Sequence, residues 1–299
     1  MKTSSGQRGA ALIIALLVTA AMTAIIVEII STVHGHVDRT SAFIEGQKAA
    51  VAAEGGVELA RKYLETLGKD YTYLDKGSFA APIDGVVLEV SVEDESGKLQ
   101  INSVVFPNGE VNEAAYSSYK ALLSTASLES SASEALADWL DMDDIARPNG
   151  AEGRFYAALR EPYGPKNGKL DTIGELALVK GYGAAASVQL ARYLTTYSDG
   201  LVNINTAPKE VLMALSEEIT PEMAEKLIER RKRKPFSNAS DIREIKGFDT
   251  LVFSLQGRIK VKSDIFRVRT RAISGGVARE VEAVVSTGNP KRVLYWRAR

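Results

Sequence analysis

The chain has no cysteine and only two histidines among its 299 residues. Without cysteine it cannot form disulfides or thiolate metal sites, although this absence does not identify the redox compartment. The histidines, His34 and His36, lie beside an apolar N-terminal segment and far along the chain from most acidic clusters. A catalytic centre or a zinc site built on histidine is therefore not expected.

An excess of charge of one sign is also lacking, because 37 Lys and Arg residues face 38 Asp and Glu residues. The molecule as a whole therefore has no strong electrostatic attraction for nucleic acid. The sequence contains no GxxxxGK[ST] phosphate loop, no GxSxG elbow and no HExxH helix. No convergent nucleophile and base are found either. We expect a protein that is not an enzyme and has no catalytic residues.

The N-terminus carries the most informative pattern. Residues 1–9 include Lys2 and Arg8, and residues 10–27 contain no charged side chain until Glu28. At about 1.5 Å per residue, a helix over 10–27 is roughly 27 Å long, which is enough to cross a bilayer core. The basic residues precede the apolar run, so the leader should stay cytoplasmic while the rest of the chain is translocated.

Three interpretations of this segment compete: a cleaved secretory signal, a plain signal anchor and a pilin-type leader. A conventional signal would have a shorter apolar core and a better cleavage site than residues 31–35. Helical periodicity continues instead, with one apolar face formed by Phe43, Ala50, Val57, Ala60, Leu64 and Leu67. No proline occurs before Pro82. We predict one helix from about residue 10 to 67, half in lipid and half packed on a domain.

Strand patterns occur at both ends of the remaining chain. Residues 85–95 alternate apolar and polar side chains, Ser96-Gly97 supplies a turn, and residues 98–104 can return as the partner strand. Near the C-terminus, strands are expected at 259–261, 265–273, 277–285 and 293–296. The residues between read as helices. The predicted fold class is α+β, with the long N-terminal helix packed on an antiparallel sheet that carries a large helical insertion.

The predicted organisation has five parts. They are a leader (1–9), the transmembrane half of the helix (10–30), the amphipathic helix with the first strands (31–104), the helical insertion (105–256) and the C-terminal strands (257–299).

The short basic leader, the Gly9–Ala10 junction and the long helix resemble type IV pilins and type II secretion pseudopilins. The resemblance implies that a prepilin peptidase cleaves after Gly9 and methylates the new N-terminus, Ala10. Ile14 stands where that family usually has a glutamate, which contacts the neighbouring subunit's N-terminal amine. Its absence suits a subunit at the tip of a filament rather than a repeating one.

Four stretches make the resemblance more specific. They are VEDESGKLQIN (92–102), LADWLDMDD (136–144), RPNGAEGRFY (147–156) and LVNINTAPKEVL (201–212). In this order they resemble the minor pseudopilin K family of type II secretion, over essentially the whole chain. The resemblance implies an inner-membrane protein with a periplasmic head, assembled at the pseudopilus tip with the minor pseudopilins I and J to support protein secretion.

Acidic side chains cluster in the middle of the chain, at Asp138, Asp141, Asp143, Asp144 and Glu152. If the helix before them ends near Leu140, most of these carboxylates lie on a loop. Clustered oxygen ligands on a flexible loop suit calcium, although the loop is not an EF-hand. Helix caps and solvated charge are the alternative. Similar K subunits bind calcium in this region, which implies a structural calcium site here, with Asn167 and Asp171 as further ligands to consider.

Residues 202–248 resemble a helix-hairpin-helix or SAM-like module. A membrane-anchored DNA-uptake protein is therefore the alternative function. The turn at residues 216–220 has no glycine and contains Glu217 and Glu218, which would repel a phosphate backbone, whereas the basic run at 230–234 would favour one. We expect a protein-contact module and no nucleic-acid partner.

Overall fold

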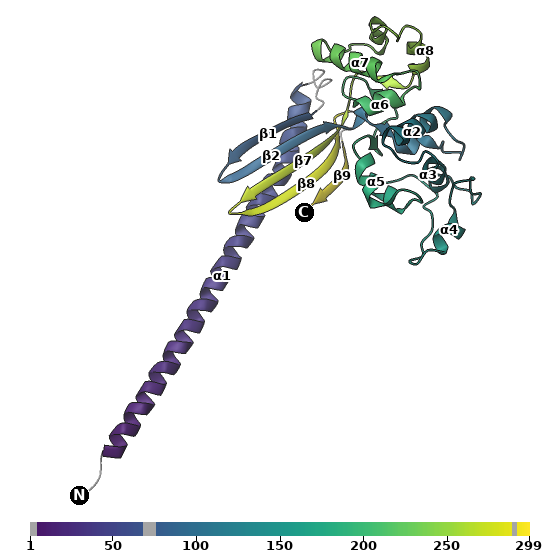
Figure 1. The fold of residues 1–299 in the computed structure, drawn as a ribbon. Helices are drawn as coiled ribbons and strands as arrows, with labels where there is room; N and C mark the ends of the chain where they lie inside the picture. Colours follow the sequence, from purple (N-terminus) through teal and green to yellow (C-terminus); the bar gives the residue numbers. More distant parts are fainter. Residues whose placement is uncertain (1–4, 68–75, 289–291) are drawn as a thin grey trace.

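A long N-terminal helix, α1 (Ser5–Leu67), runs out of the rest of the molecule in the computed structural model (Figure 1). The structure describes residues 5–67, 76–288 and 292–299. The first half of α1 makes no contact with the head, and only its second half packs on a sheet (Figure 1). The predicted helix from about residue 10 to 67 is confirmed.

Small side chains let α1 lie close to the sheet. Its buried face consists of Ala49, Ala53, Val57, Ala60 and Leu64, at the three- and four-residue spacing of one helical face. Gly56 is required by this approach, since a Cβ there would lie 2.9 Å from Cγ2 of Thr270. The prediction was wrong for Phe43, which is 65% exposed. Contact with the sheet begins only near Glu45, whose carboxylate accepts a hydrogen bond from Ser274 at the start of the turn of residues 274–276.

The sheet has five antiparallel strands in the order β1-β2-β7-β8-β9. The strands are β1 (Lys76–Ile83), β2 (Val86–Asp94), β7 (Ile265–Ser274), β8 (Val277–Ser286) and β9 (Arg292–Ala298). The predicted strand at 85–95 and the three long C-terminal strands are confirmed. Asp84 and Gly85 connect β1 to β2 with positive φ angles of 48° and 78°, which suit the tight turn of a hairpin.

The predicted pairing of residues 98–104 with β2 was wrong. After β2 the chain turns through the short 3₁₀ helix η2 (Glu95–Gly97) and leaves the sheet. Only β3 (Leu99–Gln100) is extended, and it pairs in parallel with β4 (Leu194–Thr195). The place beside β2 is filled by β1, which the sequence patterns did not predict.

Residues 95–264, between β2 and β7, form the inserted segment, which is wider than the 105–256 expected from sequence. It has its own hydrophobic core, separate from the core between α1 and the sheet. Its helices after η2 are η3 (Ile101–Val104), α2 (Glu113–Thr125), α3 (Ala132–Leu140), α4 (Gly153–Ala157), η4 (Ile173–Leu178), α5 (Gly183–Leu190), α6 (Lys209–Ala214), α7 (Pro221–Arg233), η5 (Ala239–Glu244) and α8 (Leu251–Leu255). These helices lie beyond the end of the sheet that is remote from the N-terminus (Figure 1).

The inserted segment consists of two similarly built halves. Each starts and ends with short strands that pair in parallel, β3 with β4 in the first half and β5 (Val202–Asn203) with β6 (Ile259–Lys260) in the second. In the first half, the Asn102 side chain exchanges two hydrogen bonds with the backbone of Leu170, at 2.9 and 2.8 Å. In the second, Asn205 does the same with Phe236, at 3.0 and 2.8 Å.

A 3₁₀ helix with a capping box follows each of these asparagine contacts. Glu175 accepts from the backbone N–H groups that precede η4, and Asp241 does so before η5. Such reciprocal bonds satisfy donors that a helix start would otherwise leave unpaired. Each half therefore has the same three features: a pair of short parallel strands, an asparagine side-chain contact with the backbone, and a 3₁₀ helix with a capping box.

Buried charge fixes the inserted segment to the sheet. Asp94, at the end of β2, accepts hydrogen bonds from the side chains of Asn203, Thr206 and Ser263. Glu95 contacts Lys98 at 2.9 Å and Arg267 of β7 at 2.7 Å. Burial by itself would raise the pKa of Glu95, but these two cations outweigh it and lower the pKa to about 2. Asp94 contacts Ser263 near the end of the insertion, and Glu95 at its start contacts β7, so the two carboxylates connect both ends of the insertion to the sheet.

Candidate functional site

The first half of α1 is long and apolar enough to cross a membrane, and none of its apolar window is buried. Gly9 and Ala10, the predicted processing site, both lie within this helix. Ile14, the position named from the resemblance as an assembly position, is 60% exposed on it. In water such an apolar surface would be unfavourable, whereas lipid would cover it.

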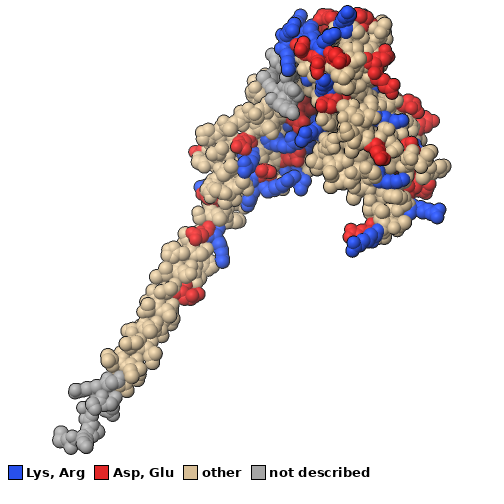
Figure 2. Space-filling view, in the orientation of Figure 1, with Lys and Arg blue, Asp and Glu red and all other residues tan. Residues whose placement is uncertain are grey.

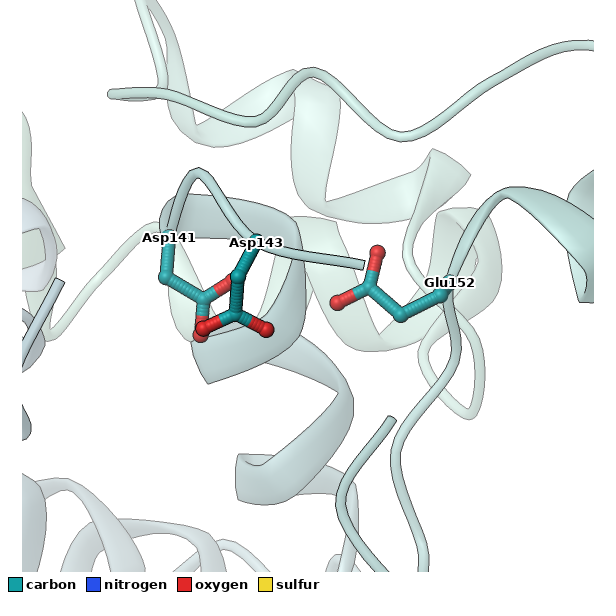
Figure 3. Close-up of side chains that lie close together, drawn as sticks. All are labelled: Asp141, Asp143 and Glu152. Atoms are coloured by element: carbon teal, nitrogen blue, oxygen red, sulfur yellow. The ribbon is translucent and has the colours of Figure 1, made fainter. Parts of the chain in front are cut away.

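A group of three carboxylates forms in the first half of the inserted segment. Asp141 follows the last residue of α3, Asp143 lies two positions further along the loop, and Glu152 precedes α4. One oxygen from each lies within 4.8 Å of the others. Figure 3 shows the Asp141 and Asp143 carboxylates side by side, with that of Glu152 pointing towards them from a separate stretch of chain. The predicted end of the helix near Leu140 is confirmed.

Three buried oxygens of this group lack hydrogen-bond partners among the described residues. Glu152 is only 6% exposed, yet neither of its carboxylate oxygens has a partner among the described residues. The same holds for Oδ1 of Asp141 and for Oδ1 of Asn167. A buried polar atom without a partner is costly, and a bound cation coordinated by these oxygens would remove that cost. The residues present therefore fit an oxygen-ligated cation.

The raised pKa values of two carboxyl groups in this cluster also indicate that a positive charge would stabilise it. Burial, followed by the negative charges of Asp138, Asp141 and Asp144, raises the pKa of Glu152 to about 7. Burial also raises the pKa of Asp141. A cation at this position would favour the ionised forms of both groups.

Asp138 and Asp141 share one guanidinium, that of Arg147. Its Nη1 donates to Oδ1 of Asp138 at 2.5 Å and to Oδ2 of Asp141 at 2.6 Å. The backbone N–H of Arg147 also donates to Asp138, at 3.1 Å. Gly150 is required here, because a Cβ would lie 1.8 Å from Oδ2 of Asp138. Asp138 is therefore occupied by Arg147 and is not part of the three-carboxylate group.

Two further acidic residues named from the sequence are not part of the group. Asp144 is exposed and does not belong to it, and Asp171 pairs with Lys166 at 2.7 Å. Of the five ligands expected from sequence, the structure brings together Asp141, Asp143 and Glu152. The role of Arg147, the basic residue within the acidic stretch, was not predicted from the sequence. The arrangement offers hard oxygen ligands, which calcium prefers, and no nucleophile paired with a base.

The hairpin of α6 and α7 lacks the features of a phosphate-binding turn. Glu217 and Glu218 are exposed at the turn between the two helices. At the basic end of α7, Arg230 pairs with Glu244 at 2.6 Å, and Arg231 donates to the carbonyl oxygens of Ile204 and Ala207. Part of the basic run therefore stabilises the fold of the second half.

The family models and the individual proteins to which this chain is similar carry the same description. Two family models, both described as type II secretion system (T2SS) protein K, match residues 97–199 and 202–261, so the boundary between them is the boundary between the two halves. Type II secretion system protein K of Pseudomonas aeruginosa is 29% identical over 255 residues, covering 79% of this chain and 76% of the relative. The protein K of Pectobacterium carotovorum subsp. carotovorum is 28% identical over 256 residues, covering 77% and 76%.

A solved structure shares the fold. It is a chain of the GspK-GspI-GspJ complex from the enterotoxigenic Escherichia coli type 2 secretion system, with a TM-score of 0.73 at 18% identity, covering 87% of this chain and 99% of that one. The predicted α+β pilin-like fold is confirmed. Together the two family models span more than half of the sequence, and this chain therefore belongs to the type II secretion system protein K family of minor pseudopilins.

Proposed function

We propose that this minor pseudopilin occupies the tip of the type II secretion pseudopilus. The observation that carries the proposal is the position of the inserted segment, which covers the end of the sheet remote from the membrane helix (Figure 1). A further subunit stacked above would meet this bulk. Ile14 supports the same position, because it cannot supply a carboxylate to the amine of a neighbouring subunit.

The proposal includes processing and location. A prepilin peptidase would remove residues 1–9, and Ala10 would become the methylated N-terminus. The helix would then span the inner membrane once, with its start in the cytoplasm and the head in the periplasm, as the basic leader favours. The exposed apolar side chains beyond the membrane, such as Phe43, would pack against the helices of other pseudopilins.

Its partners, on this proposal, are the minor pseudopilins I and J, since the similar E. coli chain was solved in a complex with proteins of those names. The protein itself would catalyse no reaction and would act as a structural component of secretion. The family assignment does not favour the alternative of a DNA-uptake receptor. The exposed Glu217 and Glu218 also argue against binding of a phosphate backbone.

We also propose that Asp141, Asp143 and Glu152 hold a structural calcium ion. The unpartnered buried oxygens and the raised pKa of Glu152 support it. When bound, the ion would neutralise the group and join the loop after α3 to the start of α4. Asn167, with its own buried unpartnered oxygen, is a further candidate ligand.

The tip position is tested by labelling the head with gold in sheared pseudopili from the native host. One label at a single end of each filament is expected, and labels spaced along filaments would contradict the proposal. Mass spectrometry of the N-terminal peptide tests processing: a methylated Ala10 is expected, and a retained Met1 would contradict it.

A further inference from the structure

The two edges of the five-stranded sheet are built differently. The edge strand β1 contains Gly77 and Pro82, and proline cannot donate a hydrogen bond to an added strand. The opposite edge strand, β9, reads RVLYWRA and contains neither residue. Val293 and Trp296 of β9 are 50% and 45% exposed. Of the features that usually protect a sheet edge, β9 has arginines and a register shift at Leu294 but no proline, so its outward N–H groups remain able to pair, and its exposed apolar side chains indicate a surface that another chain covers.

The backbone of β9 is able to accept another strand. Arg299 and Glu280 exchange both of their N–H···O hydrogen bonds, at 2.8 and 3.0 Å. In an antiparallel pair the residues alternate, so Ala298 and Trp296 direct their N–H and C=O groups away from β8. No described strand pairs with that side of β9.

Space lies beside the start of this edge. Arg292 and Leu294 border a groove of about 370 Å³ that crosses the neighbouring ends of β7 and β8, at Ile265 and Ser286. Thr196, Tyr197 and the acidic Asp264 of the inserted segment also line it. Figure 2 shows Lys and Arg side chains gathered where the sheet meets the inserted helices. An extended segment lying along β9 would therefore contact both the sheet and the insertion.

The positive charge of β9 and of the residue after it indicates which kind of segment would bind along this strand. Residues 292–299 include Arg292, Arg297 and Arg299 and no acidic residue. None of the three arginines forms an ion pair with another described residue, although Arg297 and Arg299 lie opposite Glu282 and Glu280 of β8. A second copy of this chain would bring the same cations opposite them and would be repelled, whereas an acidic segment would be attracted.

We infer that β9 is a docking strand that pairs with an extended acidic segment of a neighbouring minor pseudopilin. The inference rests on the proposed function, because it takes the neighbouring subunit as the source of that segment. Main-chain hydrogen bonds to Ala298 and Trp296 would provide affinity, and the arginines would provide selectivity.

Site-specific cross-linking in membranes of the native host tests the inference on the full-length protein. The photoreactive residue p-benzoylphenylalanine replaces Trp296 on β9, Phe79 on β1 or Phe43 on α1, with epitope-tagged pseudopilins I and J as the probes. We expect the adduct yield at Trp296 to exceed that at Phe79 at least fivefold. Efficient adducts at Phe43 with none above the Phe79 level at Trp296 would overturn the inference and leave the proposed function standing. Loss of adducts at all three positions would overturn both.

Two further variants separate charge from strand pairing. The double change Arg292→Glu with Arg297→Glu is expected to lower the Trp296 yield at least fivefold and to leave the Phe43 yield unchanged, which also shows that the protein is folded and assembled. Ala298→Pro removes one outward N–H and should lower the Trp296 yield, whereas Ala298→Val keeps that donor and should not. Unchanged yields in the arginine variant would overturn the acidic partner, and equal yields for the proline and valine variants would overturn strand pairing.

Discussion

The two halves of the inserted segment share a framework and differ in one connection. In the first half, residues 141–172 separate α3 from η4, whereas in the second only residues 234–238 separate α7 from η5. The buried side-chain polar atoms that lack a partner, among the described residues, all lie between Ser96 and Ser198. The second half therefore satisfies its polar groups internally, and the first half contains a loop that needs an external partner. The comparison shows that the shared framework is present in the half without an acidic loop, and on the calcium proposal the bound ion would stabilise that loop in the other half.

The shared asparagine contact gives the largest expected effect. Asn102→Ala and Asn205→Ala each leave a backbone N–H and a backbone C=O without their partners, so each should lower the free energy of unfolding by about 2–4 kcal/mol. Urea denaturation of the head measures this, with the exposed Asn108→Ala as control. A large loss for one asparagine and none for the other would contradict the equivalence of the halves.

Calcium should stabilise only the first half. At a free calcium concentration of about 100 times Kd, linkage gives about 2.7 kcal/mol, or a rise in Tm of roughly 5–10 °C. Glu152→Gln should remove most of that rise, while Glu161→Gln, an exposed acid on the same connection, should keep it. Differential scanning calorimetry with and without calcium checks the effect. An equal rise for the wild type and Glu152→Gln would exclude Glu152 as a ligand.

The effect of calcium should also depend on pH. Between its ordinary pKa of 4.5 and about 7, folded Glu152 keeps a proton that the unfolded chain has released, so the calcium-free protein loses stability as pH rises through this range. Calcium competes with that proton. The calcium-induced rise in Tm should therefore be larger at pH 7.5 than at pH 5.5, and Glu152→Gln should flatten the difference. A larger rise at pH 5.5 would contradict this assignment.

The two capping boxes give the smallest expected effect. Glu175→Ala and Asp241→Ala should each cost about 1 kcal/mol, since each removes the acceptor for N–H groups at the start of a 3₁₀ helix. Similar losses in urea denaturation would support the comparison. A loss confined to Glu175 would show that the first cap depends on its ion pair with Lys166 rather than on the shared motif.

Periodicity made most of the fold predictable. The apolar repeat of α1 and the alternation in β7 and β8 are long, so local patterns determine them. β1 was missed because KGSFAAPI has weak strand propensity, although Asp84-Gly85 before β2 was a hairpin signal. The partner for β2 was misassigned because Asp94 is held by side chains more than 100 residues away, at Asn203 and Thr206. Contacts at that separation leave no local pattern.

The sequence identified the acidic residues of the candidate site but predicted only part of their arrangement in space. Sequence proximity grouped all five acids, but α3 directs Asp138 towards Arg147 while the loop brings Asp141, Asp143 and Glu152 together. The contact with Arg147 depends on how the loop folds back over nine residues. Neither helical nor strand periodicity applies there, so the sequence could not show which acids come together in the three-carboxylate group and which do not.

The inserted segment leaves and re-enters the sheet at neighbouring points. Asp94, the last residue of β2, is the register partner of Phe266 in β7, so the two ends lie about one strand spacing apart. A short turn could close that gap and leave the five strands and α1 in place. The sheet and α1 could therefore carry a different domain between β2 and β7, provided that the termini of that domain lie equally close together. The new domain would have to supply polar partners for Asp94 and Glu95, and on the proposed function it would be displayed at the end of the filament.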